Sequence, residues 1–138
     1  MCSSDLIHAA AHAPPLTPVV HAKDKDLSKA WAVNARAMPF LLASLDPAFA
    51  ASEDGGEAVF FEDERRSAPY WSLYAATKSA GLDFARSYAA EAAHRGFRAH
   101  FHTPPAMPTS LHARFFPGHD PDALTPCAEA AEGVLALT

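Results

Sequence analysis

Proline is the feature that most limits how this chain can fold. The sequence holds 12 prolines against only 6 glycines. A proline inside a helix or a central strand removes a backbone donor and clashes with the preceding turn. Most of the prolines lie in three groups, namely Pro14 to Pro18, Pro104 to Pro108 and Pro117 to Pro126. These groups predict loops, and regular helices and strands are expected between them.

Composition excludes several broad classes. The 138 residues are 49% hydrophobic and 20% charged, which is typical of one globular domain spanning 1–138 and not of a disordered or collagenous chain. A net charge of −5 without a basic run argues against nucleic acid as a partner. No apolar stretch approaches the roughly 20 residues that cross a bilayer, so no membrane partner is expected. Cys2 and Cys127 lack metal-ligand spacing, and a reduced, cytoplasmic protein is expected.

Hydrophobic patterning predicts an α/β fold. Short apolar runs at 5–11, 57–61 and 97–103 predict three parallel strands, adjacent in that order. Helical spacing predicts long helices at 27–46 and 71–95, packed on one face of the sheet, and a last short helix at 125–137. The first long helix is expected to end near Asp46 and Pro47, and Pro39 predicts a kink just after Asn34.

Tyr74 and Lys78 are the first candidates for chemistry. Residues four apart share one face of a helix, so the Lys78 ammonium can approach the Tyr74 phenol. A nearby cation favours phenolate and lowers the pKa of a tyrosine toward the range of a working acid or base. Taken alone, the pair is better explained by an exposed helix face with a lysine reaching into water.

The segment Trp71-Ser72-Leu73-Tyr74-Ala75-Ala76-Thr77-Lys78-Ser79-Ala80 closely resembles the active-site helix of short-chain dehydrogenases/reductases. Asn34 precedes Tyr74 by 40 residues, and Pro104 follows it by 30, as in that family. Thr109 matches the threonine after the family's Pro-Gly turn. The stretch Leu6-Ile7-His8-Ala9-Ala10-Ala11 resembles the strand that lies under the cofactor.

The resemblance implies a hydride transfer between NAD or NADP and a small carbonyl or alcohol substrate. It makes Tyr74 the general acid or base, Lys78 the residue that lowers the tyrosine pKa and holds the nicotinamide ribose, and Asn34 the residue that positions a water. Further cofactor contacts implied by the resemblance are Ala9, Ala11, Pro104 and Thr109.

This sequence departs from the family in several places. It matches only the middle and later part of the family domain and contains no Gly-rich turn, so a partial Rossmann-like, doubly wound sheet without the N-terminal dinucleotide-binding βαβ unit is expected. Phe61 stands at the position of the family's serine, Ser67 is too close to Tyr74 to replace it easily, and Pro105 replaces a glycine. The alternative function is therefore an inactive fragment or diverged protein that associates through its long helices.

Three further expectations concern charged groups and the sheet. The 8 histidines predict no metal site, although the spacings of His8 with His12 and of His100 with His102 are those of possible ligand pairs. The charged run from Glu62 to Arg66 is expected to be a solvated loop, with the active cleft as the alternative location. The open edge of the first strand and an uncovered apolar sheet face predict self-association. Because the Gly-rich turn that would receive the pyrophosphate is absent, NAD(P) binding is expected to be no tighter than millimolar.

Overall fold

A three-stranded parallel sheet forms the centre of the computed structural model, which describes residues 5–65 and 67–138. The strands are β1 (Asp5–His8), β2 (Glu57–Phe61) and β3 (Arg98–His102), paired in the order β1-β2-β3. This confirms the expected strand order and direction, and with them the partial α/β fold. Cys2 lies outside the described residues.

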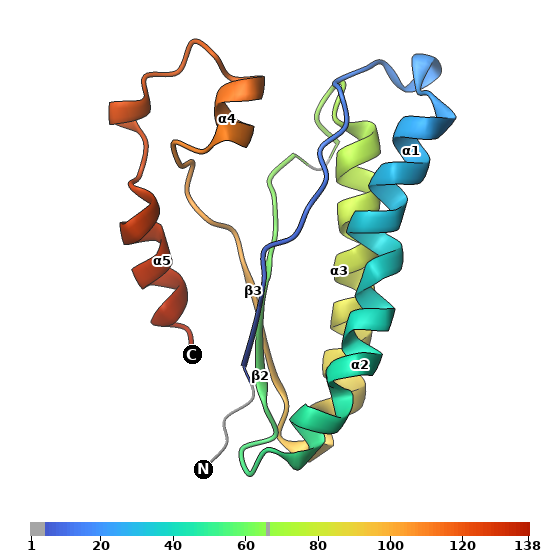
Figure 1. Ribbon diagram of the computed structural model, residues 1–138, viewed down its shortest axis with the longest axis vertical. Helices are drawn as coiled ribbons and strands as arrows, with labels where there is room; N and C mark the ends of the chain where they lie inside the picture. The colour runs from blue at the N-terminus through green and yellow to red at the C-terminus, as the bar shows by residue number, and fades with distance from the viewer. Residues whose placement is uncertain (1–4, 66) are drawn as a thin grey trace.

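Helices lie on both sides of this sheet (Figure 1). On one side are α1 (Asp24–Trp31), a π-helical segment (Ala32–Arg36), α2 (Ala37–Ala51) and α3 (Ser72–Ala92). On the other side are α4 (Ser110–Phe115) and α5 (Cys127–Leu135), and short 3-10 turns occur at Val19–His21, Ala93–Arg95 and Pro121–Ala123. The helix α4 was not predicted. In the described residues no helix is both long enough and apolar enough to span a membrane.

The face of the sheet toward α2 and α3 carries the hydrophobic core. Successive strand residues point to opposite faces, and Ala58 and Phe60 of β2 point to this one. They pack with buried side chains of α2, α3 and the segment that enters β3, which are Met38, Leu42, Phe49, Leu82, Ala85, Ala92 and Phe97. This packing fixes α3, and therefore the candidate residues on it, against the sheet.

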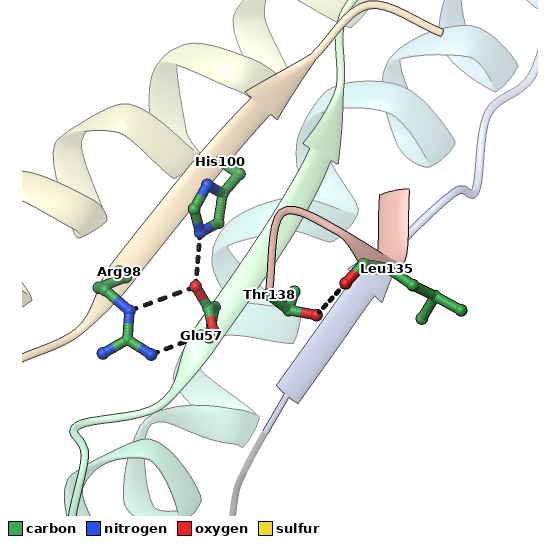
Figure 2. A network of polar contacts seen from close by, with 5 residues as sticks. All are labelled: Glu57, Arg98, His100, Leu135 and Thr138. Carbon is green, nitrogen blue, oxygen red and sulfur yellow. Dashed lines mark hydrogen bonds and ion pairs between the residues drawn. The ribbon is translucent and has the colours of Figure 1, made fainter. Parts of the chain in front are cut away.

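The opposite face of the sheet carries both polar and apolar side chains, namely Ile7, Glu57, Val59, Phe61, Arg98 and His100. Val59 is fully buried, which corrects the expectation of an apolar surface exposed to water at that position. Register places Glu57 beside Arg98, and both side chains alternate with the core-facing positions. The buried Glu57 carboxylate accepts hydrogen bonds from Arg98 at 3.2 and 3.1 Å, and its Oε1 lies 2.5 Å from His100 Nε2 (Figure 2). Ile7 of β1 is 47% exposed on the same face. In the described residues β1 is an edge strand of the sheet, because it pairs with β2 only.

β1 is shorter than predicted. It ends at His8, whereas the sequence pattern predicts a strand to Ala11. Beyond His8 the chain leaves the sheet, and the backbone of His12 pairs with a side chain instead of a strand. Its N–H donates to Asn34 Oδ1 at 2.7 Å, and its carbonyl accepts from Asn34 Nδ2 at 2.8 Å. The Asn34 side chain thus satisfies the two backbone groups of His12 that a neighbouring strand would bond in a sheet.

The first long helix also differs from its prediction in length. Pro39 is preceded by a π-helical segment at Ala32–Arg36, which confirms an irregularity around Asn34. The helix then passes through Pro47 and ends at Ala51. Pro47 and Ala43, whose carbonyl would have received the missing N–H, are both exposed, so water can satisfy that carbonyl. One more turn buries Phe49 in the core.

Candidate active site

Tyr74 and Lys78 lie one helical turn apart on α3 and are both buried, with 7% and 8% of their surface exposed. They line the same cavity of about 450 Å³, which also includes Asp63 and Thr103. Asp63 follows the carboxyl end of β2, and Thr103 follows that of β3. The pair therefore shares one helix face turned toward the carboxyl ends of the strands, where open α/β sheets bind ligands.

A carboxylate, not a hydroxyl side chain, contacts the Tyr74 phenol. Tyr74 Oη donates a hydrogen bond to Asp63 Oδ2 at 3.2 Å. Burial of the phenol, together with the charge of Asp63 and this hydrogen bond, raises the pKa of Tyr74 above its ordinary value. The sequence-based expectation that Lys78 lowers this pKa is wrong for the present arrangement, because burial and Asp63 act in the opposite direction.

Asp63 was missed because sequence spacing pointed two residues earlier. Phe61, at the family's serine position, lies on the second face of the sheet, where its ring contacts His102. Ser67 lines neither cavity beside Tyr74. Asp63, which lies 11 residues before Tyr74 in the loop between β2 and α3, reaches the phenol instead. The available signal was the charged run from Glu62 to Arg66, for which the active cleft was the alternative location.

Lys78 is held in a poorly solvated position. Burial lowers the pKa of Lys78 from its ordinary value, and the charge of Asp63 partly opposes this effect. His8, at the carboxyl end of β1, is 9% exposed, and burial followed by the charge of Lys78 lowers its pKa. An ammonium and an imidazole thus share a region of low dielectric next to Tyr74.

Asn34 holds the site together from the π-helical segment. Besides its two hydrogen bonds to His12, Nδ2 donates to Thr77 Oγ1 at 3.0 Å. Thr77 is 1% exposed and directly precedes Lys78. Its Oγ1 also donates to the Leu73 carbonyl at 2.7 Å. The Asn34 side chain therefore ties the loop after β1 to the α3 turn that carries Tyr74 and Lys78.

Gly81 is a further residue that the sequence did not single out. A Cβ atom placed on Gly81 would lie 1.9 Å from the carbonyl oxygen of Asn34. Only glycine permits α3 to approach the π-helical segment this closely. The sequence signal for this close approach was a glycine within an alanine-rich helix.

A second cavity of about 380 Å³ is also lined by Tyr74. Pro104, Thr109 and Ala13 line it, together with aromatic residues of α4 and of the turn before α3. Thr109 also caps α4, because its side chain accepts a hydrogen bond from the His112 N–H at 3.1 Å. Ala9, Ala11 and Asn34 line neither cavity.

The charged loop after β2 is solvated as expected, since Asp63 and Glu64 are exposed. It also lines both cavities that include Tyr74, through Glu62, Asp63, Glu64 and Arg65. Glu62 pairs with Arg86 of α3. Arg66 lies outside the described residues. The loop is therefore both exposed to solvent and adjacent to the candidate residue Tyr74.

Only one of the 8 histidines, His8, is buried, and the other seven are exposed or half-buried. His100 and His102 share one face of β3, but His100 binds Glu57 and His102 contacts Phe61. His8 is buried on β1, whereas His12 lies in the following loop. Within residues 5–65 and 67–138, no three His, Cys, Asp or Glu side chains form a group that could hold a metal ion.

Comparisons with known proteins agree with the fold and with the site-bearing segments. A family model described as enoyl-(acyl carrier protein) reductase matches residues 5–130. A short chain dehydrogenase from Salmonella enterica serovar Typhi is 27% identical, with a TM-score of 0.83 over 91% of this chain and 52% of its own. A protein from Pseudomonas syringae, also described as a short chain dehydrogenase, is 27% identical, with a TM-score of 0.85 over 96% and 54%.

A third similar structure carries a cofactor. It is described as a short chain dehydrogenase from Escherichia coli complexed with NADPH, and it is 26% identical, with a TM-score of 0.83 over 91% of this chain and 52% of its own. No curated protein matches. The chain spans about half the length of the solved structures it resembles. The match over residues 5–130 shows that this chain belongs to the short-chain dehydrogenase/reductase family.

Proposed function

We propose that this chain carries the proton-transfer part of a nicotinamide-dependent carbonyl reductase, with Tyr74 as the general acid. The supporting observation is the buried pair of Tyr74 and Lys78 on one face of α3, at the carboxyl ends of the strands. Tyr74 is protonated at neutral pH, as any tyrosine with a pKa of 10.0 or above is, but burial and Asp63 make it a weaker acid until a ligand displaces the carboxylate. A protonated phenol suits reduction of a carbonyl better than oxidation of an alcohol, which needs phenolate as the base.

In this proposal, the Tyr74 hydroxyl gives its proton to the carbonyl oxygen while the carbonyl carbon gains a hydride, so that an alcohol forms. The phenolate left behind is then reprotonated, and the buried Lys78 ammonium stabilises it in the meantime. Because Tyr74 donates to Asp63 in the free protein, the substrate oxygen has to displace that carboxylate as the acceptor. Asn34 acts as a positioning residue, since it holds Thr77 and thereby the α3 turn.

The residues present fit one end of a nicotinamide cofactor. Lys78 and Tyr74 would hold the nicotinamide ribose, and Pro104 and Thr109 line the adjoining cavity. The cofactor, NADH or NADPH, would supply the hydride. The sequence contains no Gly-rich turn between a strand and a helix to receive the pyrophosphate. Affinity for NAD(P) is therefore expected to be millimolar or weaker.

Turnover of NADPH and NADH with a panel of small ketones and aldehydes tests this proposal, with absorbance at the nicotinamide band as the readout. Substitution Tyr74→Phe removes only the hydroxyl and should abolish carbonyl-dependent oxidation of the cofactor. Tyr88→Phe is the matched control, because Tyr88 donates to Asp46 away from both cavities. Activity that survives in Tyr74→Phe would contradict the role of Tyr74.

The second candidate function is association through the long helices. Several large apolar side chains on these helices are exposed, including Trp31 at 46%, Phe40 at 63% and Phe84 at 43%. Exposed apolar groups of this size favour burial against another protein surface. A concentration-dependent shift in sedimentation velocity that Phe40→Ser removes would support this candidate. A monomer at all concentrations would contradict it.

A further inference from the structure

His8 is a buried titratable residue to which the proposed function gives no role. It is the last residue of β1, and 9% of its surface is exposed. Its Nδ1 atom is buried and has no hydrogen-bond partner within residues 5–65 and 67–138. A buried polar atom without a partner lowers stability, so its presence in a folded protein needs a structural or functional explanation.

Lys78 presents the complementary case. It is 8% exposed and lines the cavity of about 450 Å³. An ammonium has three donors and no acceptor, yet that of Lys78 makes no hydrogen bond or ion pair in the part of the chain that the structure describes. The nearby carboxylate of Asp63 accepts from Tyr74, and the amide oxygen of Asn34 accepts from the His12 N–H. A buried donor group therefore still needs an acceptor.

The fold brings His8 and Lys78 to the same side of the sheet. Leu6 and His8 of β1 point to the face that α2 and α3 cover, where Leu6 packs against the core. Register places His8 beside Phe60, and their ring centres lie 6.2 Å apart. Phe60 shares the core with Leu82, which follows Lys78 by one turn of α3. Because His8 ends β1 and Lys78 lines a cavity at the carboxyl ends of the strands, both lie at the same end of this interface.

The charge of Lys78 also acts on the His8 ring. Burial, followed by this charge, lowers the pKa of His8 below its ordinary value of 6.5, and a contact with its own backbone opposes them less strongly. His8 is therefore neutral at neutral pH. A neutral imidazole has one nitrogen that carries a proton and one that accepts a hydrogen bond. With the proton on Nε2, the buried Nδ1 is an acceptor.

We propose that His8 is a positioning residue for Lys78, whose ammonium donates to His8 Nδ1 directly or through one bridging water. This contact gives each of the two unpartnered groups the partner that it needs. It also stabilises the charged form of Lys78 in a place where burial disfavours it. The catalytic consequence rests on the proposed function, because the charged Lys78 then stays beside the phenolate that Tyr74 forms after proton transfer.

The tautomer of His8 in the wild-type protein tests this proposal without cofactor or turnover. Nitrogen-15 labelling of the histidines shows which ring nitrogen carries the proton, and His8→Gln assigns the signals of His8. We expect the neutral ring to carry its proton on Nε2 at about pH 8. A proton on Nδ1 would overturn the proposal, because that atom could not then accept from Lys78.

The pKa of Lys78 provides a second test. Carbon-13 at lysine Cε gives one signal for each lysine, and Lys78→Met assigns that of Lys78. His8→Phe keeps an aromatic ring but removes the acceptor, so it should lower the pKa of Lys78 by about one pH unit, as loss of a hydrogen bond to a charged group predicts. His8→Gln supplies an amide oxygen as acceptor and should restore most of this loss.

His94→Phe is the matched control for these variants. His94 is exposed in the 3-10 turn Ala93–Arg95, which follows the far end of α3 from Lys78. This substitution should leave the pKa of Lys78 unchanged. Circular dichroism checks the fold of every variant, and the wild-type tautomer decides the proposal if His8→Phe unfolds.

Two results for Lys78 would also overturn the proposal. One is a pKa that is the same in the wild type and in His8→Phe, and the other is an equal decrease in His8→Phe and His8→Gln. Turnover separates this proposal from the proposed function. If the wild type never oxidises NADPH but the pKa of Lys78 depends on His8 as expected, the positioning role stands and the reductase function fails. If the wild type reduces carbonyls and His8 leaves this pKa unchanged, the reductase function stands and the positioning role fails.

Discussion

The two sides of Tyr74 differ in how they are built. On the α3 side, buried hydrogen bonds and close packing join Asn34, Thr77 and Gly81. On the loop side, the phenol meets Asp63, which belongs to a short charged segment that lines open cavities. The first side is part of the fold, so changes there should cost stability. The second side contributes little to packing, so changes there should alter ligand binding and protonation instead.

The largest expected effect comes from breaking the α3 side at Gly81. Gly81→Ala places a methyl group only 1.9 Å from the carbonyl oxygen of Asn34, so α3 must move away. We expect the free energy of unfolding to fall by about 1 to 3 kcal/mol or more, measured by urea denaturation. Gly133→Ala in α5 is the matched control, because no atom lies within 4 Å of its added Cβ.

The control should behave in the opposite way. Gly133→Ala lies within a helix and in open space, so it should stabilise the protein by about 0.5 to 1 kcal/mol through its effect on the unfolded chain. Equal effects of the two substitutions would show that α3 does not depend on close approach to the π-helical segment.

A loss of similar size is expected from Asn34→Ala. This change leaves the Thr77 hydroxyl and both backbone groups of His12 without their amide partner. Buried polar groups without partners cost about 1 to 3 kcal/mol in the free energy of unfolding. Glu64→Gln on the loop side should stay within about 0.5 kcal/mol of the wild type in the same urea titration. If Glu64→Gln lowered the free energy of unfolding as much as Asn34→Ala, the proposed difference in stability between the two sides of Tyr74 would be contradicted.

Much of the α3 side could be anticipated from sequence. The four-residue spacing of Tyr74 and Lys78 placed both on one helix face, and the strand order followed from the alternation of apolar runs. These features depend on local periodicity, which a sequence displays directly. The role of Asn34 was only partly anticipated, because its amide groups bind His12 and Thr77. Those partners lie 22 and 43 residues away in the chain.

The contact between Asp63 and Tyr74 could not be predicted from the spacing of residues in the sequence. The position of Asp63 depends on how many residues separate β2 from α3 and on the path between them, and Ser67 and Tyr70 adopt positive φ angles of 62° and 71° in that path. Non-glycine residues rarely adopt such angles, so the sequence does not predict this loop path. In a similar way, the helix α2 extends past Pro47 because burial of Phe49 outweighs the local signal to stop.

A smaller, pH-dependent effect is expected for Lys78. Burial lowers its pKa in the folded protein, so the unfolded chain binds more protons between that lowered value and the ordinary value of 10.5. Wild-type stability should therefore rise with pH through this window. Lys78→Met removes the buried charge, and its free energy of unfolding should exceed that of the wild type most at neutral pH.

The advantage of Lys78→Met should shrink as the pH approaches 10.5, as measured by urea denaturation at a series of pH values. Lys29→Met is the control, because Lys29 is an exposed lysine of α1. An advantage of Lys78→Met that is independent of pH would mean that the ammonium carries no burial penalty.

The ionisation of Tyr74 tests most directly whether Asp63 controls the phenol. Protein labelled with carbon-13 at tyrosine Cζ gives one signal for each of the 3 tyrosines, and single Phe substitutions assign them. We expect that Tyr74 ionises well above the ordinary tyrosine pKa of 10.0 and that Asp63→Asn moves its titration to lower pH. A wild-type Tyr74 that ionises at or below 10.0, or a titration that Asp63→Asn leaves unchanged, would contradict control of the phenol by Asp63.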